Sequence, residues 1–285
     1  MTWQTVSVVV VLLMVVSGVR ADEPTDLRVM SFNIRYGSAR DGEDHWEKRR
    51  ELLFSTIEAF KPDLLGTQEV EAFQADELKK RLSGYGFVGA GRDDGKEKGE
   101  MAPIYFRSDR FEKLDAGHFW LSETPETPGS KGWDTSLPRV ASWVKLRDKA
   151  SKREFTFLNT HFDHRGKVAR LESAKLVRKR LAALPGNPPA VVTGDFNTGE
   201  GSEPYQALVG GDGPKLIDSY RSVHPERKKD EGTFGGFQGT RTGARIDWIL
   251  HTDHFAATAA AIDHTNKAGR YPSDHYPVTA VLRWK

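Results

Sequence analysis

"PAVVTGDFNT" (residues 189–198) joins a short apolar run to a carboxylate, an aromatic ring and an amide. The run "AVVT" has the length and the β-branched content of a buried strand. Gly, Asp and Asn all favour turns, so a turn alone is one explanation of "GDFNT". The other explanation is a functional site at a strand end, which requires partners for Asp195 and Asn197 elsewhere in the chain.

The same combination of a strand and polar side chains recurs along the sequence. In chain order the polar residues are Asn33 after "RVMSF", Glu69 after "LLGTQ", His161 and Asp163 after "FTFLNT", and Asp274 and His275 before "YPVTAVL". Asp247 lies inside "RIDWIL", where an unpaired carboxylate would be costly to bury. We expect these strand ends to gather at the rim of one cleft, where active sites are commonly found.

Oxygen ligands dominate this set, and the chain has no cysteine. Carboxylate oxygens favour a hard cation, and Mg²⁺ is commonly held by one or two carboxylates together with substrate phosphate oxygens. No His-x-x-x-His or Cys-x-x-Cys spacing indicates zinc instead. The pattern therefore predicts a Mg²⁺-dependent hydrolytic site, with Mn²⁺ as the alternative ion and the number of ions, one or two, left open.

The periodicity of apolar residues predicts more strands than helices. Helical spacing occurs in 47–60, 75–82 and 167–184, and alternation over 140–148 and 153–162 indicates a hairpin pair. Further strands are expected at 27–37, 64–70, 101–108, 110–122, 189–197, 244–252 and 276–285. This pattern favours an α/β sandwich with mixed or antiparallel sheets.

Residues 1–21 have the pattern of a secretory signal peptide. The apolar stretch 6–16 is too short to cross a bilayer, which takes about 20 residues. Val19 and Ala21 suit cleavage after Ala21, although "MTWQT" lacks the usual Lys or Arg. A buried strand or an uncleaved anchor is the alternative. Cleavage would leave residues 22–285 as a single domain, periplasmic or secreted, without stable membrane insertion.

The mature chain would be nearly neutral. Loss of Arg20 leaves 41 Lys and Arg (42 minus 1) against 40 Asp and Glu. Non-specific binding to nucleic acid depends on the release of counterions by basic surfaces. The net charge therefore does not favour nucleic acid as a partner, although the basic stretch 175–181 keeps that partner open. We expect a monomer.

Six motifs follow one another: "SFNIRYG" (31–37), "LLGTQEV" (64–70), "LNTHFDHRG" (158–166), "VVTGDFNT" (191–198), "RIDWIL" (245–250) and "SDHYPV" (273–278). In this order they resemble the endonuclease/exonuclease/phosphatase superfamily, from about residue 27 to the last residue. The stretch "GTFGGFQG" (232–239) resembles an exported bacterial branch, some of whose relatives are thought to act on phosphorylated glycans. The resemblance implies a DNase I-like fold, a four-layer α/β sandwich of two packed sheets flanked by helices.

The resemblance also implies a role for each motif. Glu69 resembles the main metal ligand, and Asn33 and Asp274 resemble further oxygen ligands or their water-mediated neighbours. Asp195 matches the residue that orients or deprotonates the attacking water. Asn197 matches the amide that contacts the phosphate.

The resemblance also implies roles for the two histidines and for their carboxylate partners. His275 matches a residue that contacts a phosphoryl oxygen, and Asp247 would pair with it and fix its tautomer. His161 resembles a second histidine that contacts the phosphate or acts as an acid. Glu100 stands where some nucleases keep the carboxylate partner of that histidine.

Residues around these motifs are open to two interpretations. Arg139 either binds phosphate or is a surface strand arginine, and Arg245 either reaches the rim of the site or does not. Asp163 and His164 either shape the substrate pocket or lead into the helix at 167–184. In the Gly-rich and Pro-rich loops, Trp133, Phe234 and Phe237 either stack on a sugar ring or a base, or anchor their loops.

Three classes of function, together with one further activity, remain after the sequence has been considered. The favoured one is an exported Mg²⁺-dependent phosphatase or phosphodiesterase whose partner is a small or glycan-linked phosphate ester. The alternative is a nuclease, of the DNase type or of the 3′-5′ exoribonuclease (deadenylase) type, and a lipid-directed, sphingomyelinase-like activity also stays open. A phosphate-binding module without activity is the third, although none of the six motifs is broken.

Overall fold

The computed structural model describes residues 1, 26–186, 188–210 and 213–285. Within them the chain forms two six-stranded sheets, ordered β11-β12-β1-β2-β4-β3 and β5-β6-β7-β8-β10-β9. The predicted signal peptide falls almost entirely outside the described residues. The elements are β1 (Leu27–Asn33), η1 (Gly42–Asp44), α1 (Trp46–Phe60), β2 (Leu64–Gln68), α2 (Ala72–Arg81), β3 (Tyr85–Val88), β4 (Ile104–Arg107), β5 (Phe111–Trp120), β6 (Val140–Asp148), β7 (Glu154–His161), α3 (Lys167–Ala182), β8 (Ala190–Asp195), α4 (Glu203–Gly210), β9 (Leu216–Asp218), α5 (Ser219–Val223), β10 (Asp247–Thr252), β11 (Phe255–Ile262) and β12 (Val278–Trp284).

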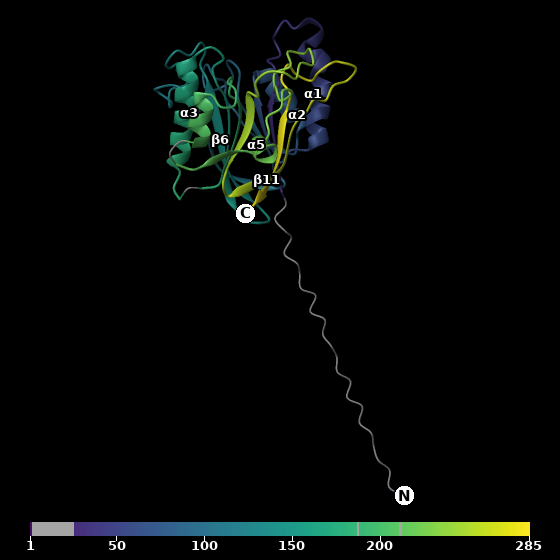
Figure 1. Cartoon of the computed structure of the whole chain (residues 1–285), viewed down its shortest axis with the longest axis vertical. Helices are drawn as coiled ribbons and strands as arrows, with labels where there is room; N and C mark the ends of the chain where they lie inside the picture. The colour runs from purple at the N-terminus through teal and green to yellow at the C-terminus, as the bar shows by residue number, and fades with distance from the viewer. Residues whose placement is uncertain (2–25, 187, 211–212) are drawn as a thin grey trace.

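The two sheets pack face to face, and helices cover their outer faces (Figure 1). One apolar core lies between the sheets and includes Val29, Phe157 and Val191. A second core packs β7, β8 and β10 against α3 and α4, and a third packs β1, β2 and β4 against α1 and α2. Three cores separate four layers, so the predicted four-layer α/β sandwich with mixed sheets is confirmed.

Both mixed sheets contain one parallel pair among antiparallel neighbours. β1 runs parallel to β2, and β7 runs parallel to β8. Parallel strands end on the same edge of a sheet, so the polar residues that follow them lie side by side. The described residues contain no helix that is both long and apolar enough to cross a membrane.

The side chains that face the other sheet change from apolar to polar along each strand. In β8, Val191 belongs to the central core, Thr193 bonds to Asn159, and Asp195 ends the row. β7 carries Phe155 and Phe157 in the core, then Asn159 and His161. Alternate side chains of a strand lie on the same face of the sheet. The last side chain of β7 and of β8 that faces the other sheet therefore lies at the edge where both sheets end.

Asn159 forms a fully satisfied hydrogen-bond centre just behind that edge. Its side-chain oxygen accepts from Gln68 Nε2 at 2.7 Å and from Thr193 Oγ1 at 2.9 Å. Its amide nitrogen donates to the carbonyls of Thr67 and Pro103. Because all four hydrogen bonds of this amide are made, the burial of Asn159 carries no unpaired polar atom.

Several elements were not predicted from the sequence. β11 reads "FAATAAAI", and its alanines carry little strand preference of their own. It becomes a strand because β12 pairs with it along its whole length. β3, β9, α4 and α5 are also short elements that pattern alone did not predict. The charged loop 91–100 is folded into a turn by backbone hydrogen bonds such as that from Arg92 N to Glu100 O.

The close approach of the two sheets at the polar layer can be tested by a substitution at Gly66. A β-carbon at this position would lie less than 3 Å from the side chains of Thr193 and Asn159. We expect Gly66→Ala to lower the free energy of unfolding by about 1–3 kcal/mol, as overpacking of a dense interior does. Chemical denaturation measures the change. Gly84→Ala, where no atom lies within 4 Å of the added carbon, is the matched control; equal stability of both variants would contradict the close packing.

Candidate active site

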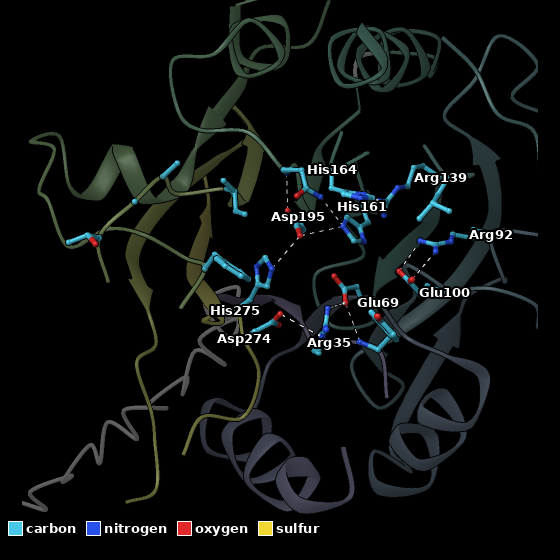
Figure 2. Close-up of a pocket in the computed structure, with 18 residues that line it drawn as sticks. Arg35, Glu69, Arg92, Glu100, Arg139, His161, His164, Asp195, Asp274 and His275 are labelled. Carbon is cyan, nitrogen blue, oxygen red and sulfur yellow. Dashed lines mark hydrogen bonds and ion pairs between the residues drawn. The ribbon is translucent and has the colours of Figure 1, made fainter. Parts of the chain in front are cut away.

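A cleft of about 890 Å³ opens at the edge where the polar rows of the two sheets end. Figure 2 shows that charged side chains converge on it from opposite sides. It receives residues from both sheets and from the loops that follow their strands. The lining residues are Arg35, Tyr36, Glu69, Arg92, Glu100, Leu137, Arg139, His161, His164, Asp195, Asn197, Phe234, Thr242, Gly243, Ala244, Ile246, Asp274 and His275.

One sheet contributes a row of three side chains from adjacent strands. His161 ends β7, Asp195 ends β8 and Asp247 begins β10. In the strand register Asp195 is paired with Asp247 on one side and with His161 on the other. The other sheet contributes Asn33 at the end of β1 and Glu69 directly after β2, and Asp274 and His275 precede β12.

Asp195 is the centre of the hydrogen-bond network. Its carboxylate accepts from Asn33 Nδ2 at 2.9 Å and from the backbone nitrogen of Asn197 at 2.9 Å. His161 Nε2 lies 3.4 Å and His275 Nε2 lies 3.7 Å from Asp195 Oδ2. The side chain is 1% exposed. Burial raises the pKa of Asp195, and the nearby Asp247 carboxylate raises it further.

His275 is held as a cation by two carboxylates. Its Nδ1 lies 2.9 Å from Asp247 Oδ2, and Asp195 lies on the side of Nε2. Burial alone would lower the pKa of His275, but the negative charges of Asp247 and Asp195 raise it well above its usual value. With Nδ1 engaged by Asp247, the Nε2–H group points toward Asp195 and the cleft.

His161 is in the opposite protonation state. Burial lowers the pKa of its imidazole, and the positive charges of Arg139 and Arg92 lower it further. Its Nε2 lies 3.0 Å from Asn197 Nδ2, which can only donate. A neutral imidazole whose Nε2 accepts a hydrogen bond has no proton on that atom to give. In this arrangement His161 is suited to contact rather than to acid chemistry.

The carboxylates of Glu69 and Asp274 lie at the base of the cleft beside Arg35. The guanidinium of Arg35 is 3.9 Å from each of them and makes a bidentate ion pair with Asp41. Burial raises the pKa of Asp274, and repulsion from Glu69 adds to it. Ligand atoms of Glu69, Asp195 and His275 also lie within 4.8 Å of one another. These crowded oxygens fit a hard divalent cation, because a cation would relieve their repulsion.

Asn33 differs from the oxygen ligand that was expected. Its amide nitrogen lies between two carboxylates and donates to Glu69 Oε1 at 3.0 Å and to Asp195 Oδ2 at 2.9 Å. Its oxygen accepts from the backbone nitrogen of Arg35. In this orientation no amide oxygen faces the cation position. Asn33 instead separates two negative charges, since an NH₂ group can donate to both.

Three residues of the cleft have left-handed backbone conformations that non-glycine residues rarely adopt. Their φ angles are +57° at Arg35, +59° at Glu69 and +50° at Asn197. Each follows a strand and redirects its side chain at the point where regular pairing ends. Asn tolerates this conformation, whereas Glu and Arg do so at a cost of about 1–2 kcal/mol. Such strain is commonly found at functional sites.

A basic wall, formed by Arg139, His164 and Arg92, bounds the side of the cleft near His161. Arg139 is buried and donates to Asp163 at 3.4 Å and to His164 Nδ1 at 2.9 Å. Its Nη1 atom has no hydrogen-bond partner among the residues that the structure describes. Of the two interpretations of Arg139, the surface arginine is therefore excluded.

Asp163 supports this wall from below and does not line the cleft. Hydrogen bonds from the backbone of Gly166 and from Ser136 outweigh burial and hold the pKa of Asp163 well below its usual range. Asp163 also accepts from Arg139. Of the two interpretations of Asp163, the lead into α3 is therefore the one that the contacts support. Its position lets it orient Arg139 and the lead into α3, while His164 does line the cleft.

Two other expectations about charged residues are corrected. Glu100 makes a bidentate ion pair with Arg92, with both distances 2.8 Å, and not with His161. A planar guanidinium matches a carboxylate better than an imidazole does. Arg245 is not on the rim: it is 2% exposed and forms ion pairs with Asp218 and Glu200 away from the cleft.

Arg49 was not predicted as part of the site. This buried side chain in α1 donates to the carbonyls of Ile34 at 2.7 Å, Arg35 at 3.0 Å and Pro272 at 2.9 Å. Burial lowers its pKa to about 10, so the guanidinium stays charged at neutral pH. Arg49 therefore clamps together the loop after Asn33 and the loop before Asp274. Only the folded arrangement of these loops reveals this contact.

The sequence matches the endonuclease/exonuclease/phosphatase family over residues 30–275, and the chain belongs to this family. The family's name denotes nucleases and phosphatases, hydrolases that act on nucleic acids or phosphate esters, and the acidic groups of the cleft are consistent with a metal-dependent hydrolase. The DNase I-like fold inferred from the resemblance is confirmed.

Particular relatives resemble the chain over most of its length. An endonuclease/exonuclease/phosphatase family protein of Bacteroides thetaiotaomicron is 38% identical with a TM-score of 0.84, and the match covers 92% of this chain and 99% of that one. A mannosyl-6-phosphatase of the same organism is 37% identical with a TM-score of 0.82, covering 90% and 100%. Mouse nocturnin is 24% identical over 281 residues, 88% of this chain and 63% of nocturnin. The chain spans 38% to 63% of the length of the first curated relatives it matches.

The two histidines beside Asp195 should titrate on opposite sides of the usual imidazole pKa of about 6.5. In the metal-free protein, His275 should keep its proton as the pH rises through that value, and His161 should lose its proton before the pH reaches it. NMR of imidazole-labelled protein measures both. In Asp247→Asn the His275 pKa should fall. Titration of both imidazoles near 6.5 in the wild type would contradict the assignment.

Replacement of Arg49 by lysine should destabilise the protein although the charge is kept. One ammonium cannot reach all the carbonyls that the guanidinium satisfies, and a buried unpaired carbonyl costs about 1–3 kcal/mol. We expect Arg49→Lys to lower the free energy of unfolding by about this amount in urea denaturation. Arg50→Lys is the control, because Arg50 is 39% exposed and its ion pair is with Glu77. Equal effects of the two variants would contradict the clamp.

Proposed function

We propose that this chain is a divalent-metal-dependent phosphatase that releases phosphate from a monoester of a small molecule or glycan. The observation that carries the proposal is the convergence of Asp195, His275 and Glu69 from two sheets on one cleft. A buried base, a buried imidazolium and a carboxylate cation site are the groups that phosphoryl transfer to water requires.

Asp195 is assigned to the attacking water. Asn33 and the backbone of Asn197 fix both of its oxygens, so the carboxylate has one orientation toward the cleft. Its raised pKa makes it a better proton acceptor than an ordinary aspartate. Asn197 lines the cleft on a left-handed turn, and its amide nitrogen lies 3.0 Å from both His161 Nε2 and the carbonyl of Phe162, so it is assigned to holding His161 in place beside the phosphate.

His275 is assigned to the phosphoryl oxygens. A protonated Nε2 donates a charged hydrogen bond to an oxygen whose negative charge grows in the transition state. Asp247 holds the imidazole by Nδ1 and keeps it protonated. Arg139, His164 and neutral His161 stand on the facing wall and are assigned to contacts with the remaining oxygens.

Glu69 and Asp274 are the residues that would hold Mg²⁺, with Mn²⁺ as the alternative and the number of ions undecided. When bound, the ion would neutralise the negative charge of the phosphoryl oxygens and lower the pKa of a bound water. Support for this assignment comes from the crowded carboxylates and from the raised pKa of Asp274. Arg35, paired with Asp41, lies against both side chains and holds them in place.

In the proposed reaction a water oxygen attacks phosphorus opposite the ester oxygen. A new P–O bond forms as the bond between phosphorus and the ester oxygen breaks. Asp195 accepts a proton from the water, and the departing alkoxide takes a proton from solvent. The products are inorganic phosphate and an alcohol. The preference for a monoester is supported by the 37% identical mannosyl-6-phosphatase.

We also propose that the protein is exported, as a monomer of residues 22–285 in the periplasm or medium. The support is the sequence of residues 1–21, with its short apolar run and small residues before Asp22. Intact mass of the protein recovered from outside the cytoplasm should correspond to a chain that begins at Asp22. A chain that keeps residues 1–21 would contradict cleavage.

The reaction class is tested with an aryl phosphomonoester and the matching phosphodiester, each with Mg²⁺ and with chelator. We expect chelator-sensitive release of phosphate from the monoester. Asp195→Asn should lower kcat by about 10²–10⁴-fold, the usual contribution of a general base. Asp253→Asn, at a surface carboxylate that is 61% exposed, is the control. Cleavage of the diester alone would favour a phosphodiesterase or nuclease, and no metal-dependent turnover would favour an inactive module.

A further inference from the structure

Phe234 leaves a large apolar surface open to solvent beside the catalytic imidazole. It is 49% exposed, lines the cleft, and its ring centroid lies 5.1 Å from that of His275 at an interplanar angle of 69°. The two rings therefore meet edge to face, and the exposed part of Phe234 lines the cleft. An apolar ring at this position gains nothing from water and can gain from a ligand.

The structure distinguishes among Trp133, Phe234 and Phe237, the three loop aromatic residues for which the sequence left the same two interpretations open. Phe237 faces the guanidinium of Arg49 at 5.6 Å, and neither Phe237 nor Trp133 lines the cleft. The contact with Arg49 is that of a loop anchor at Phe237, and Trp133 lies outside the cleft lining. Phe234 and Tyr36 are the aromatic residues among those that line the cleft.

The backbone around Phe234 is fixed to the catalytic segments. The carbonyl of Asp274 accepts from Gly235 N at 2.7 Å and from Gly236 N at 2.9 Å. Phe234 itself forms an isolated β-bridge with His275. The backbone that carries the ring is therefore fixed relative to the backbone of His275, as the support of a binding surface requires.

Thr233 extends the same connection to the other catalytic strand. Its hydroxyl accepts from Ile246 N at 3.0 Å and from Asp247 N at 3.1 Å, and its carbonyl accepts from Tyr276 N at 2.7 Å. The segment thus bridges the two strands that carry Asp247 and His275. The ring, the imidazole and its carboxylate partner form one rigid unit.

The cleft is also much larger than a phosphoryl group. Its volume of about 890 Å³ is that of a site for a ligand with a ring or several rings. Near Phe234, small residues leave the space open: Thr242, Gly243 and Ala244 line the same cleft. The cleft therefore has room for the part of the substrate beyond the phosphate.

We propose that Phe234 is the platform for the leaving group, and that this group is a sugar ring whose apolar face packs on the phenyl ring. This inference rests on the proposed phosphatase activity for the placement of the phosphate. A sugar ring has one face rich in C–H groups and polar hydroxyls around its edge. A single aromatic surface with hydroxyl-bearing Thr242 and Tyr36 along the lining suits such a ring.

A nucleobase is the competing ring. Bases present two apolar faces and gain from stacking on each of them. The other aromatic ring of the lining belongs to Tyr36, which is half-buried and has the guanidinium of Arg35 4.5 Å from its ring centroid. A single open aromatic ring, rather than a pair that could enclose a base, favours the sugar.

The test compares two phosphomonoesters of a primary alcohol, a hexose 6-phosphate and glycerol 3-phosphate. The reacting bond is of the same kind, and only the first carries a ring. In Phe234→Ala the ratio of kcat/KM for the hexose ester to that for the glycerol ester should fall about tenfold, the scale of one lost stacking contact. Phe234→Tyr should retain the ratio. Phe73→Ala, at a phenylalanine that is 45% exposed and outside the cleft lining, is the matched control.

An unchanged ratio in Phe234→Ala, or an equal loss on both esters, would overturn the platform. A larger loss on adenosine 5′-monophosphate than on the hexose ester would overturn the assignment of a sugar. If the wild type releases no phosphate from any ester, the proposed function fails, and calorimetric binding of hexose 6-phosphate still tests the platform. Binding that weakens in Phe234→Ala and not in Phe73→Ala would support it. Absence of binding to the wild type would overturn it.

Discussion

The hydrogen bond from Asn33 to Asp195 joins the two sheets at the end where their facing rows are polar. Everything in the site is arranged around it. One sheet brings His161, Asp195 and Asp247 together through strand register, and the other brings Glu69 and the segment before β12. Apolar side chains hold the sheets together over most of their length, so the catalytic edge can be built from groups that would repel one another elsewhere.

That edge concentrates charge at a cost to stability. Asp195 and Asp274 are buried carboxylates with raised pKa values, and His275 is a buried imidazolium. Glu69 adopts a left-handed backbone conformation as well. Proteins keep such unfavourable features where function needs them and compensate elsewhere. Here the compensation includes the Asn159 hydrogen-bond centre and the carbonyl clamp of Arg49.

The sequence was sufficient to predict the sandwich and the gathering of polar residues at strand ends, because both follow from local alternation and from six motifs in a known order. Orientation within the site could not be predicted in this way. Which atom of Asn33 faces Asp195 depends on two carboxylates that are 36 and 162 residues away along the chain. Glu100 pairs with Arg92 because the guanidinium of Arg92 lies within hydrogen-bond distance of its carboxylate. The clamp formed by Arg49 depends on backbone carbonyls of loops that are distant in the sequence. The strand β11 depends on its pairing with β12 rather than on the strand preference of its own residues.

The central claim is that water, activated at Asp195, attacks phosphorus. Hydrolysis of a phosphomonoester in ¹⁸O-labelled water, followed by mass spectrometry of both products, tests it most directly. The account predicts one ¹⁸O atom in each released phosphate and none in the alcohol, since the bond that breaks joins phosphorus to the ester oxygen. Label in the alcohol would show that the carbon–oxygen bond breaks instead, and would contradict the assigned chemistry of the site.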